Sequence, residues 1–253
     1  MGFRLVIIAP GNLGEQGGSY PAEDWPQRLE EAVPGIRVSV CRSVDEAMGP
    51  IEEADAAFGD VVPELFERAR RLRWIACPQA GPPADYYHRA LIDSDVVVTN
   101  VRGVYNDHIS AHLMAFVLAF ARGLDRYIPQ QLDRNWEPGH GTVYLPAATA
   151  VIVGVGGIGG ETARLCAEFG MDVIGVDPRV TDPQPDIAEL RPPQALPSLL
   201  PRADFVIVTV PETPETQGMF AAAQFRAMKA GSYLINIGRG ATVLLDDLAD
   251  ALQ

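Results

Sequence analysis

The stretch VIVGVGGIGGETARLCAEFGMDVIGVD, residues 151–177, decides the fold. An apolar run leads into a glycine-rich turn, an amphipathic segment follows, and a second apolar run ends in an acidic residue. Gly154, Gly156 and Gly159 form the pattern G-x-G-x-x-G inside this context. The stretch therefore predicts a βαβ unit of the Rossmann type, whose glycine turn binds the phosphates of a dinucleotide.

Each part of this pattern has a distinct physical role. Gly154 permits the tight turn, Gly156 lets a pyrophosphate approach the backbone, and Gly159 lets the helix pack closely on the strand. We expect the amides of Gly157 and Ile158 to face the phosphates, because the dipole at a helix N-terminus favours anions. A glycine-rich turn without a ligand is the alternative, and the full strand–turn–helix–strand context disfavours it.

The acidic residue at the end of the unit predicts the choice of cofactor. Asp177 lies 18 residues after Gly159, where a carboxylate can accept hydrogen bonds from the ribose hydroxyls. The same carboxylate would repel a 2′-phosphate, so we expect NAD rather than NADP. Arg179 lies nearby and weakens this preference.

The rest of the chain repeats the alternation of short apolar runs with amphipathic segments. This alternation predicts an α/β fold of two doubly wound parallel-sheet lobes, residues 1–101 and 102–253, the second being the Rossmann lobe. The expected strands cover residues 4–9, 36–41, 56–60, 72–77, 95–100, 149–155, 171–177, 204–210 and 233–237.

Two segments do not follow this alternation. Residues 106–134 form a long helical stretch that is apolar on most faces, which predicts burial between domains or between subunits. Residues 177–198 are rich in proline and are expected to form a surface loop.

A second glycine pattern near the N-terminus competes with the first. Gly11, Gly14 and Gly17 follow an apolar run in the same way. No helix is expected to start directly on these glycines, and the next apolar run ends in Cys41 instead of an acid. We therefore favour a plain loop here.

Composition excludes several classes of partner. The chain has 20 basic and 33 acidic residues, a formal net charge of −13, so we expect neither nucleic acid nor an anionic membrane as a partner. Its longest apolar run, residues 113–121, is too short to span a bilayer. Three scattered cysteines and no signal-peptide layout predict reduced thiols in a cytoplasmic protein.

The candidate site residues lie at the carboxyl ends of the strands of the second lobe. Ligands of parallel sheets bind beyond these ends, and the stretches TVPETPET (209–216) and IGRG (237–240) follow two of them. Arg239, between two glycines, is suited to bind a carboxylate through its planar guanidinium; the alternative is an arginine that caps the strand or pairs with Asp246 or Asp247. Further expected cofactor contacts are Val210, Pro211, Thr216, Ile237 and Gly238.

The four histidines lie away from these strand ends. We expect His112 to be a packed core residue, His108 a helix cap or lobe contact, and His88 and His140 surface or loop residues. Their spacing predicts no metal site.

Three stretches resemble the D-isomer-specific 2-hydroxyacid dehydrogenase family. They are residues 151–179, the PxTxxT-containing segment 203–220, and FRAMKAGSYLINIGRGATV at 225–243, which is similar to the family's MKPGAxLINxxRG segment. The resemblance covers residues 100–253 well, whereas in the first 100 residues only ACPQAG (76–81) resembles the family's substrate loop.

This resemblance implies an NAD-dependent oxidoreductase that transfers hydride between the cofactor and a small anionic 2-oxo or 2-hydroxy acid. Arg239 would be the catalytic residue in this chain: it would bind the carboxylate of the substrate and polarise its carbonyl group. Backbone amides around Ala80 and Gly81 would complete the carboxylate site. Residues 1–101 would be a flavodoxin-like substrate lobe, and the helix from about Asp107 to Arg122 would form a homodimer.

The family's catalytic histidine and glutamate lie a few dozen residues beyond the arginine. We therefore expect this chain to be a portion of a longer protein, and the C-terminal part of that protein to be missing from it. We also expect the 253 residues by themselves to lack significant turnover. A dinucleotide sensor without turnover and a formate- or phosphite-type dehydrogenase are the alternatives. The substrate itself is not identified.

Overall fold

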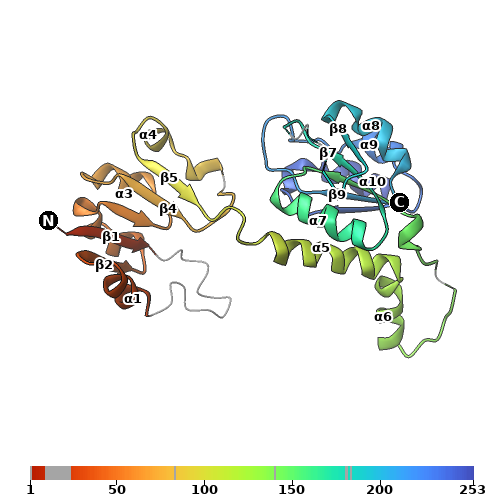
Figure 1. Ribbon diagram of the computed structural model, residues 1–253, viewed down its shortest axis with the longest axis horizontal. Coiled ribbons are helices and arrows are strands. Elements are labelled where there is room, and N and C mark those ends of the chain that lie inside the picture. The colour runs from red at the N-terminus through yellow and green to blue at the C-terminus, as the bar shows by residue number, and fades with distance from the viewer. Residues whose placement is uncertain (1, 9–23, 83, 140, 180–181, 183) are drawn as a thin grey trace. The chain divides into compact units, whose positions relative to one another are not determined.

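The computed structural model describes residues 2–8, 24–82, 84–139, 141–179, 182 and 184–253, and the chain divides into two compact units, residues 1–102 and 103–253 (Figure 1). The competing glycine pattern at Gly11, Gly14 and Gly17 and the ring of His140 lie outside the described residues.

The first unit is a five-stranded parallel sheet in the order β2-β1-β3-β4-β5. This order is that of flavodoxin-like folds. Its apolar core includes Val6, Ile51 and Ile75. The strands are β1 (Phe3–Ile8), β2 (Ile36–Cys41), β3 (Ala56–Phe58), β4 (Trp74–Cys77) and β5 (Val97–Asn100); the helices are α1 (Trp25–Ala32), α2 (Val44–Ala47), α3 (Pro63–Arg68) and α4 (Arg89–Ile92).

The second unit is also a five-stranded parallel sheet, in the order β10-β9-β6-β7-β8. The order reverses direction between β6 and β9, which makes the ends of these two strands the switch point where ligands bind in such sheets. The strands are β6 (Thr149–Val153), β7 (Asp172–Val176), β8 (Glu189–Arg191), β9 (Phe205–Val208) and β10 (Tyr233–Asn236); the helices are α5 (Asn106–Ala121), α6 (Leu124–Leu132), α7 (Gly157–Glu168), α8 (Leu196–Leu199), α9 (Ala222–Ala227) and α10 (Leu245–Ala251).

Both faces of this second sheet are buried. Ile152 of β6 packs in one apolar cluster with residues of α5 and α7, and Val151 of the same strand packs in another with residues of α8 and α9. A strand covered on both faces reads as a continuous apolar run, which is the pattern found in the sequence. The predicted fold class, two parallel α/β sheets, is confirmed.

One expectation about secondary structure is wrong, whereas the expected helix from about Asp107 to Arg122 corresponds to α5. The proline-rich stretch 177–198 is not only a loop, because it holds β8 and the start of α8. The helical stretch 106–134 is two helices, because Gly123 adopts a left-handed conformation (φ 66°) between α5 and α6. A helix cannot continue through this conformation, which glycine adopts without a steric penalty.

Helix α5 is apolar because it is packed within its own unit. Leu113, Met114, Val117 and Ala121 are buried in the cluster that α5 shares with α7 and the sheet. In the described part of the chain, no helix combines the length and apolar character needed to cross a membrane. All three cysteines are buried free thiols.

Candidate functional site

The turn after β6 is built around two glycines that the chain needs for different reasons. Gly154 has a left-handed conformation with φ 94°, which side chains rarely tolerate. Thr209, just after β9, donates a hydrogen bond of 2.6 Å from its hydroxyl to the carbonyl oxygen of Gly154. A Cβ atom on Gly159 would overlap that same carbonyl oxygen, so α7 can pack on the turn only if residue 159 is glycine.

Helix α7 begins directly on this turn. The amide of Gly160 donates to the carbonyl of Gly156 at 2.7 Å, which closes the first helical turn. The preceding amides, those of Gly157, Ile158 and Gly159, therefore lack acceptors within the helix, as the first amides of every α-helix do. They form a concentration of donors at the positive end of the helix dipole.

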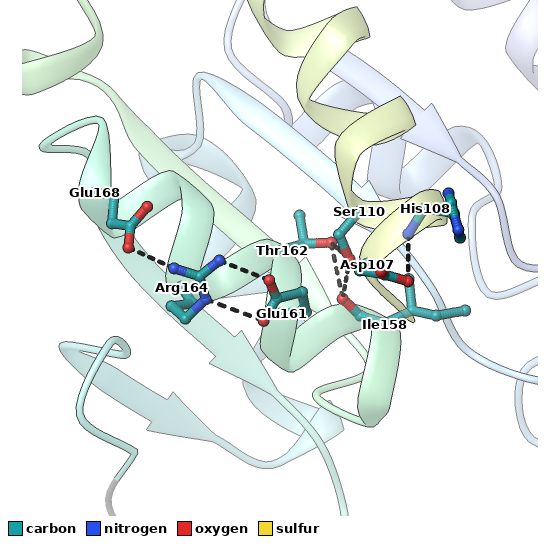
Figure 2. Close-up of polar contacts among 8 residues, drawn as sticks. All are labelled: Asp107, His108, Ser110, Ile158, Glu161, Thr162, Arg164 and Glu168. Atoms are coloured by element: carbon teal, nitrogen blue, oxygen red, sulfur yellow. Dashed lines mark hydrogen bonds and ion pairs between the residues drawn. The ribbon is translucent and has the colours of Figure 1, made fainter. Parts of the chain in front are cut away.

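Helix α5 is fastened to this first turn of α7 by buried hydroxyl groups (Figure 2). Ser110 of α5 donates to the carbonyl oxygen of Ile158 at 3.1 Å. Thr162 of α7 donates to the same oxygen at 2.8 Å, and its hydroxyl lies 3.2 Å from that of Ser110. Both side chains are completely buried, so these bonds fix the position of the two helix starts.

The carboxylate of Asp177 organises the other side of the turn. It is only 4% exposed, and it accepts hydrogen bonds from the amides of Val155 (2.9 Å) and Arg179 (2.8 Å), one on each oxygen. Each oxygen has a further lone pair for a ligand. The guanidinium of Arg179 lies 3.8 Å from Asp177, and its side chain is 70% exposed.

A cavity of about 740 Å³ joins these elements at the carboxyl edge of the sheet. Six predicted cofactor residues line it together: Gly154, Gly156, Asp177, Val210, Pro211 and Thr216. The cavity is also lined by residues that the sequence does not predict individually, among them Pro178, Pro193, Gln194, Leu196, Thr209, Thr213, Glu215 and Met219. Thr209, Thr213 and Glu215 belong to the stretch 209–216 that had been singled out, whereas nothing in the stretch 192–196 marks it as part of a site.

The loop after β9 is shaped by Thr216. Its buried hydroxyl accepts from the amide of Thr213 at 2.9 Å and donates to the carbonyl of Pro211 at 2.7 Å. Beside it, a hydrogen bond from the Thr213 side chain lowers the pKa of Glu215 below its ordinary value. The cavity therefore presents two carboxylates, Asp177 and Glu215, against the single guanidinium of Arg179.

Arg239 follows β10 at the same edge of the sheet, but its surroundings differ from those expected. The strand ends at Asn236, lies at the edge of the sheet and is only partly buried, and Arg239 itself is exposed. Its Nη1 atom donates to the carbonyl of Gly238 at 2.8 Å. Asn236 shapes the turn, because its carboxamide accepts from the amide of Gly238 and donates to the carbonyl of Arg239, each at 3.0 Å.

The remaining predicted residues fall into two groups. Ile237 and Gly238 lie beside the end of β9, where the amide of Ile237 donates to Val208 at 3.1 Å and Gly238 packs on the backbone of Val210. Ala80 and Gly81 belong to the first unit, in the exposed segment after β4, and the carbonyl of Ala80 accepts a 2.8 Å bond from Asn100.

None of the described histidines directly follows a strand of the second sheet. His88 lies in the loop before α4, as expected, and caps that helix: its Nδ1 atom accepts from the amide of Leu91, and Nε2 lies 3.1 Å from the carbonyl oxygen of Val61. His112 is exposed on α5, edge-on to Phe116, and the expectation of a core residue is wrong. His108 is exposed in the first turn of α5.

Comparison with known proteins identifies the second unit. Residues 114–253 match the family described as "D-isomer specific 2-hydroxyacid dehydrogenase, NAD binding domain". An NAD-binding domain, and NAD as the predicted cofactor, are therefore confirmed for this part of the chain.

Individual relatives agree with this match. The D-lactate dehydrogenase of Streptococcus pyogenes serotype M1 is 27% identical over 87% of this chain and 68% of its own length. The D-3-phosphoglycerate dehydrogenase of Methanocaldococcus jannaschii is 25% identical, and the aligned part covers 91% of this chain but only 45% of the relative. A D-isomer specific 2-hydroxyacid dehydrogenase from Xanthobacter autotrophicus Py2, solved with NADPH and MES, superposes with a TM-score of 0.81 and 27% identity over 100% of this chain and 77% of that chain.

Proposed function

Because the chain belongs to the D-isomer specific 2-hydroxyacid dehydrogenase family, we propose that it serves hydride transfer between NAD(H) and a small 2-hydroxy or 2-oxo acid. The observation that carries this proposal is the cavity at the carboxyl edge of the second sheet. Its glycine turn, its helix start and the carboxylate of Asp177 are the three features that a dinucleotide requires.

The residues present fit this cofactor in shape and in charge. The open space around Gly156, where an added Cβ would meet nothing within 4 Å, allows a phosphate to approach the backbone. We propose that the amides of Gly157 and Ile158 bind the pyrophosphate, that Asp177 accepts from the ribose hydroxyls, and that Thr216 acts by holding the loop around Val210 and Pro211. Gly154 and Gly159 contribute by leaving space for the turn and for the packing of α7. Ile237 and Gly238 form the edge of the site toward the reactive nicotinamide end of the cofactor.

We propose Arg239 as the group that binds the substrate carboxylate. Its guanidinium is exposed at the edge where the carboxyl ends of the strands lie, and its backbone is held by the side chain of Asn236. Ala80 and Gly81 remain proposed substrate contacts contributed by the first unit.

The test separates this role from a structural one. In the full-length protein, Arg239→Ala should reduce kcat/KM for a 2-oxo acid by about two orders of magnitude, because a two-pronged, charge-assisted contact is lost. The Kd for NADH should stay unchanged. Arg239→Lys keeps the charge without the planar fork and should restore part of the loss. Normal kinetics combined with a lowered melting temperature would instead assign Arg239 to the fold.

Binding of NAD(H) without turnover is the second candidate, because the glycine turn and Asp177 serve a dinucleotide whether or not a substrate reacts. Of the described histidines, His88 caps a helix in the first unit, and His108 and His112 lie on α5. Oxidation of NADH by the full-length protein in the presence of pyruvate, glyoxylate or hydroxypyruvate decides between the two functions. We propose the cytoplasm as the location, because the cysteines are all free thiols.

A further inference from the structure

The first residue of α5 lies directly on the start of α7. A Cβ atom built on Gly157 would lie 2.5 Å from Nδ2 and 2.8 Å from Oδ1 of Asn106. The carboxamide of Asn106 therefore fills the space that a side chain at position 157 would occupy. Among the residues that the structure describes, this half-buried carboxamide has no hydrogen-bond partner.

This placement follows from the way the two helices are joined. Asn106 and Ser110 are four residues apart on α5 and lie on the same face of the helix. Ser110 is bonded to the carbonyl of Ile158, the residue after Gly157 (Figure 2). The bond that fixes Ser110 therefore also places Asn106 beside the first turn of α7.

The other polar side chains nearby are unsuited to an anion. Asp107 and Glu161 are carboxylates close enough that Asp107 raises the pKa of Glu161, although a hydrogen bond from Arg164 outweighs this effect. The guanidinium of Arg164 is bonded to Glu161 and to Glu168 (Figure 2). Asn106 is the neutral donor that contacts the start of the helix.

We infer that Asn106 is a positioning residue for the cofactor, whose Nδ2 donates a hydrogen bond to a pyrophosphate oxygen beside the amides of Gly157 and Ile158. The inference rests on the proposed function, because it requires a dinucleotide at this turn. It also explains the glycine at position 157: a larger residue there would displace the carboxamide.

The experiment is a double-mutant cycle read out by NADH titration. Asn106→Ala should weaken NADH binding by about tenfold through loss of a hydrogen bond to a charged group. Gly157→Ala should have a similar effect, because its methyl group pushes the flexible carboxamide aside. The double variant should be no weaker than either single variant, since both changes remove the same contact.

Two further measurements separate this contact from a structural effect. Asn106→Asp has the same shape but adds a negative charge beside two phosphates, and should weaken NADH binding more than Asn106→Ala does. Adenosine, which has no phosphate, should bind all of these variants as it binds the wild type, measured by its displacement of the fluorescence of bound NADH.

The outcomes are distinct for the two proposals. A wild-type chain that does not bind NADH overturns both the proposed function and this inference. A wild-type chain that binds NADH, with Asn106→Ala and Asn106→Asp binding it equally well, overturns the inference alone. Additive losses in the double variant, or an equal loss of adenosine binding, also overturn it.

Discussion

At Gly159 the requirement for glycine is one of space, and at the neighbouring Gly160 there is no such requirement. A Cβ on Gly159 would overlap the backbone carbonyl of Gly154, whereas a Cβ on Gly160 would meet nothing within 4 Å. Gly159→Ala should therefore lower the free energy of unfolding by about 1–3 kcal/mol or more and abolish NADH binding. Gly160→Ala is the matched control and should raise stability by about 0.5–1 kcal/mol, because alanine favours the helix. Urea denaturation measures both; equal effects would contradict the packing described here.

Asp177 has two functions that a single substitution can separate. Its carboxylate accepts from the amides of Val155 and Arg179, and we propose that it also faces the ribose. Asp177→Asn keeps one acceptor oxygen for the buried amide of Val155, gives up the bond from the amide of Arg179 and removes the charge, so the ratio of the Kd for NADPH to that for NADH should fall by about tenfold, while both cofactors still bind. Asp177→Ala should in addition destabilise the fold by about 1–3 kcal/mol, because the buried amide of Val155 loses its partner. An unchanged cofactor ratio in Asp177→Asn would contradict the proposed position of the ribose.

The buried carboxylate of Asp55 should make the stability of the first unit depend on pH in the acidic range. The amide of Arg4 donates to its buried carboxylate at 3.0 Å and Arg71 pairs with it at 3.1 Å, which together lower its pKa below the ordinary value of 3.8. Because the folded pKa is depressed, this stabilisation is present above about pH 4 and is lost as the pH falls below it. The wild type should therefore lose stability between pH 5 and 3 more steeply than Asp55→Asn. Asp93→Asn, at an exposed ion pair, should follow the wild-type curve; parallel curves for Asp55→Asn would refute this assignment.

At the scale of elements, the link between α5 and α7 depends on buried hydroxyl groups. Ser110→Ala removes one of two donors to the carbonyl of Ile158 and leaves Thr162 in place, so no buried group loses its last partner. The expected cost is about 1 kcal/mol of unfolding free energy. Ser198→Ala, at an exposed hydroxyl on α8, is the control and should stay within about 0.5 kcal/mol. A Ser110→Ala protein as stable as the control would show that packing alone joins the helices.

The elements that the sequence predicted are those with a strong apolar period. Strand β6 was found because its residues are buried on both faces, and the turn at Gly154 because only glycine adopts its conformation. Strand β8 was missed because it has only three residues, is partly exposed and carries Glu189 and Arg191. Nothing in its local sequence therefore indicates a strand that pairs with β7. The contact between Asn106 and Gly157 was missed for a related reason: it joins two helix starts 51 positions apart, and an asparagine at a helix start is common for local reasons.

At the scale of the whole molecule, α6 offers a second apolar surface for the proposed homodimer, beside the one expected on α5. Helix α5 buries Leu113, Met114, Val117 and Ala121 within its own unit but leaves Phe116 exposed, whereas α6 has no buried residue. Leu124, Ile128 and Leu132 recur every four residues and so share one face of α6; Leu132 is 79% exposed, and Trp136, which follows, is 91% exposed. Exposed apolar faces of this kind mark contact surfaces, and we propose that α6 meets a second copy of the chain.

Charge substitutions on α6 test this proposal. The wild-type chain should sediment as a dimer at micromolar concentration, and Ile128→Lys combined with Leu132→Lys should sediment as a monomer, because two like charges would face each other across the contact without partners. Both positions are exposed in the monomer, so the substitutions should not disturb the fold of the monomer itself. The melting temperature of the double variant should fall only by the amount that dimerisation adds to that of the wild type. Ile92→Lys, at an equally apolar and exposed position on α4, is the control and should remain a dimer. A wild type that is monomeric at every concentration would refute the dimer, and a dimer that survives the charges on α6 would place its interface elsewhere.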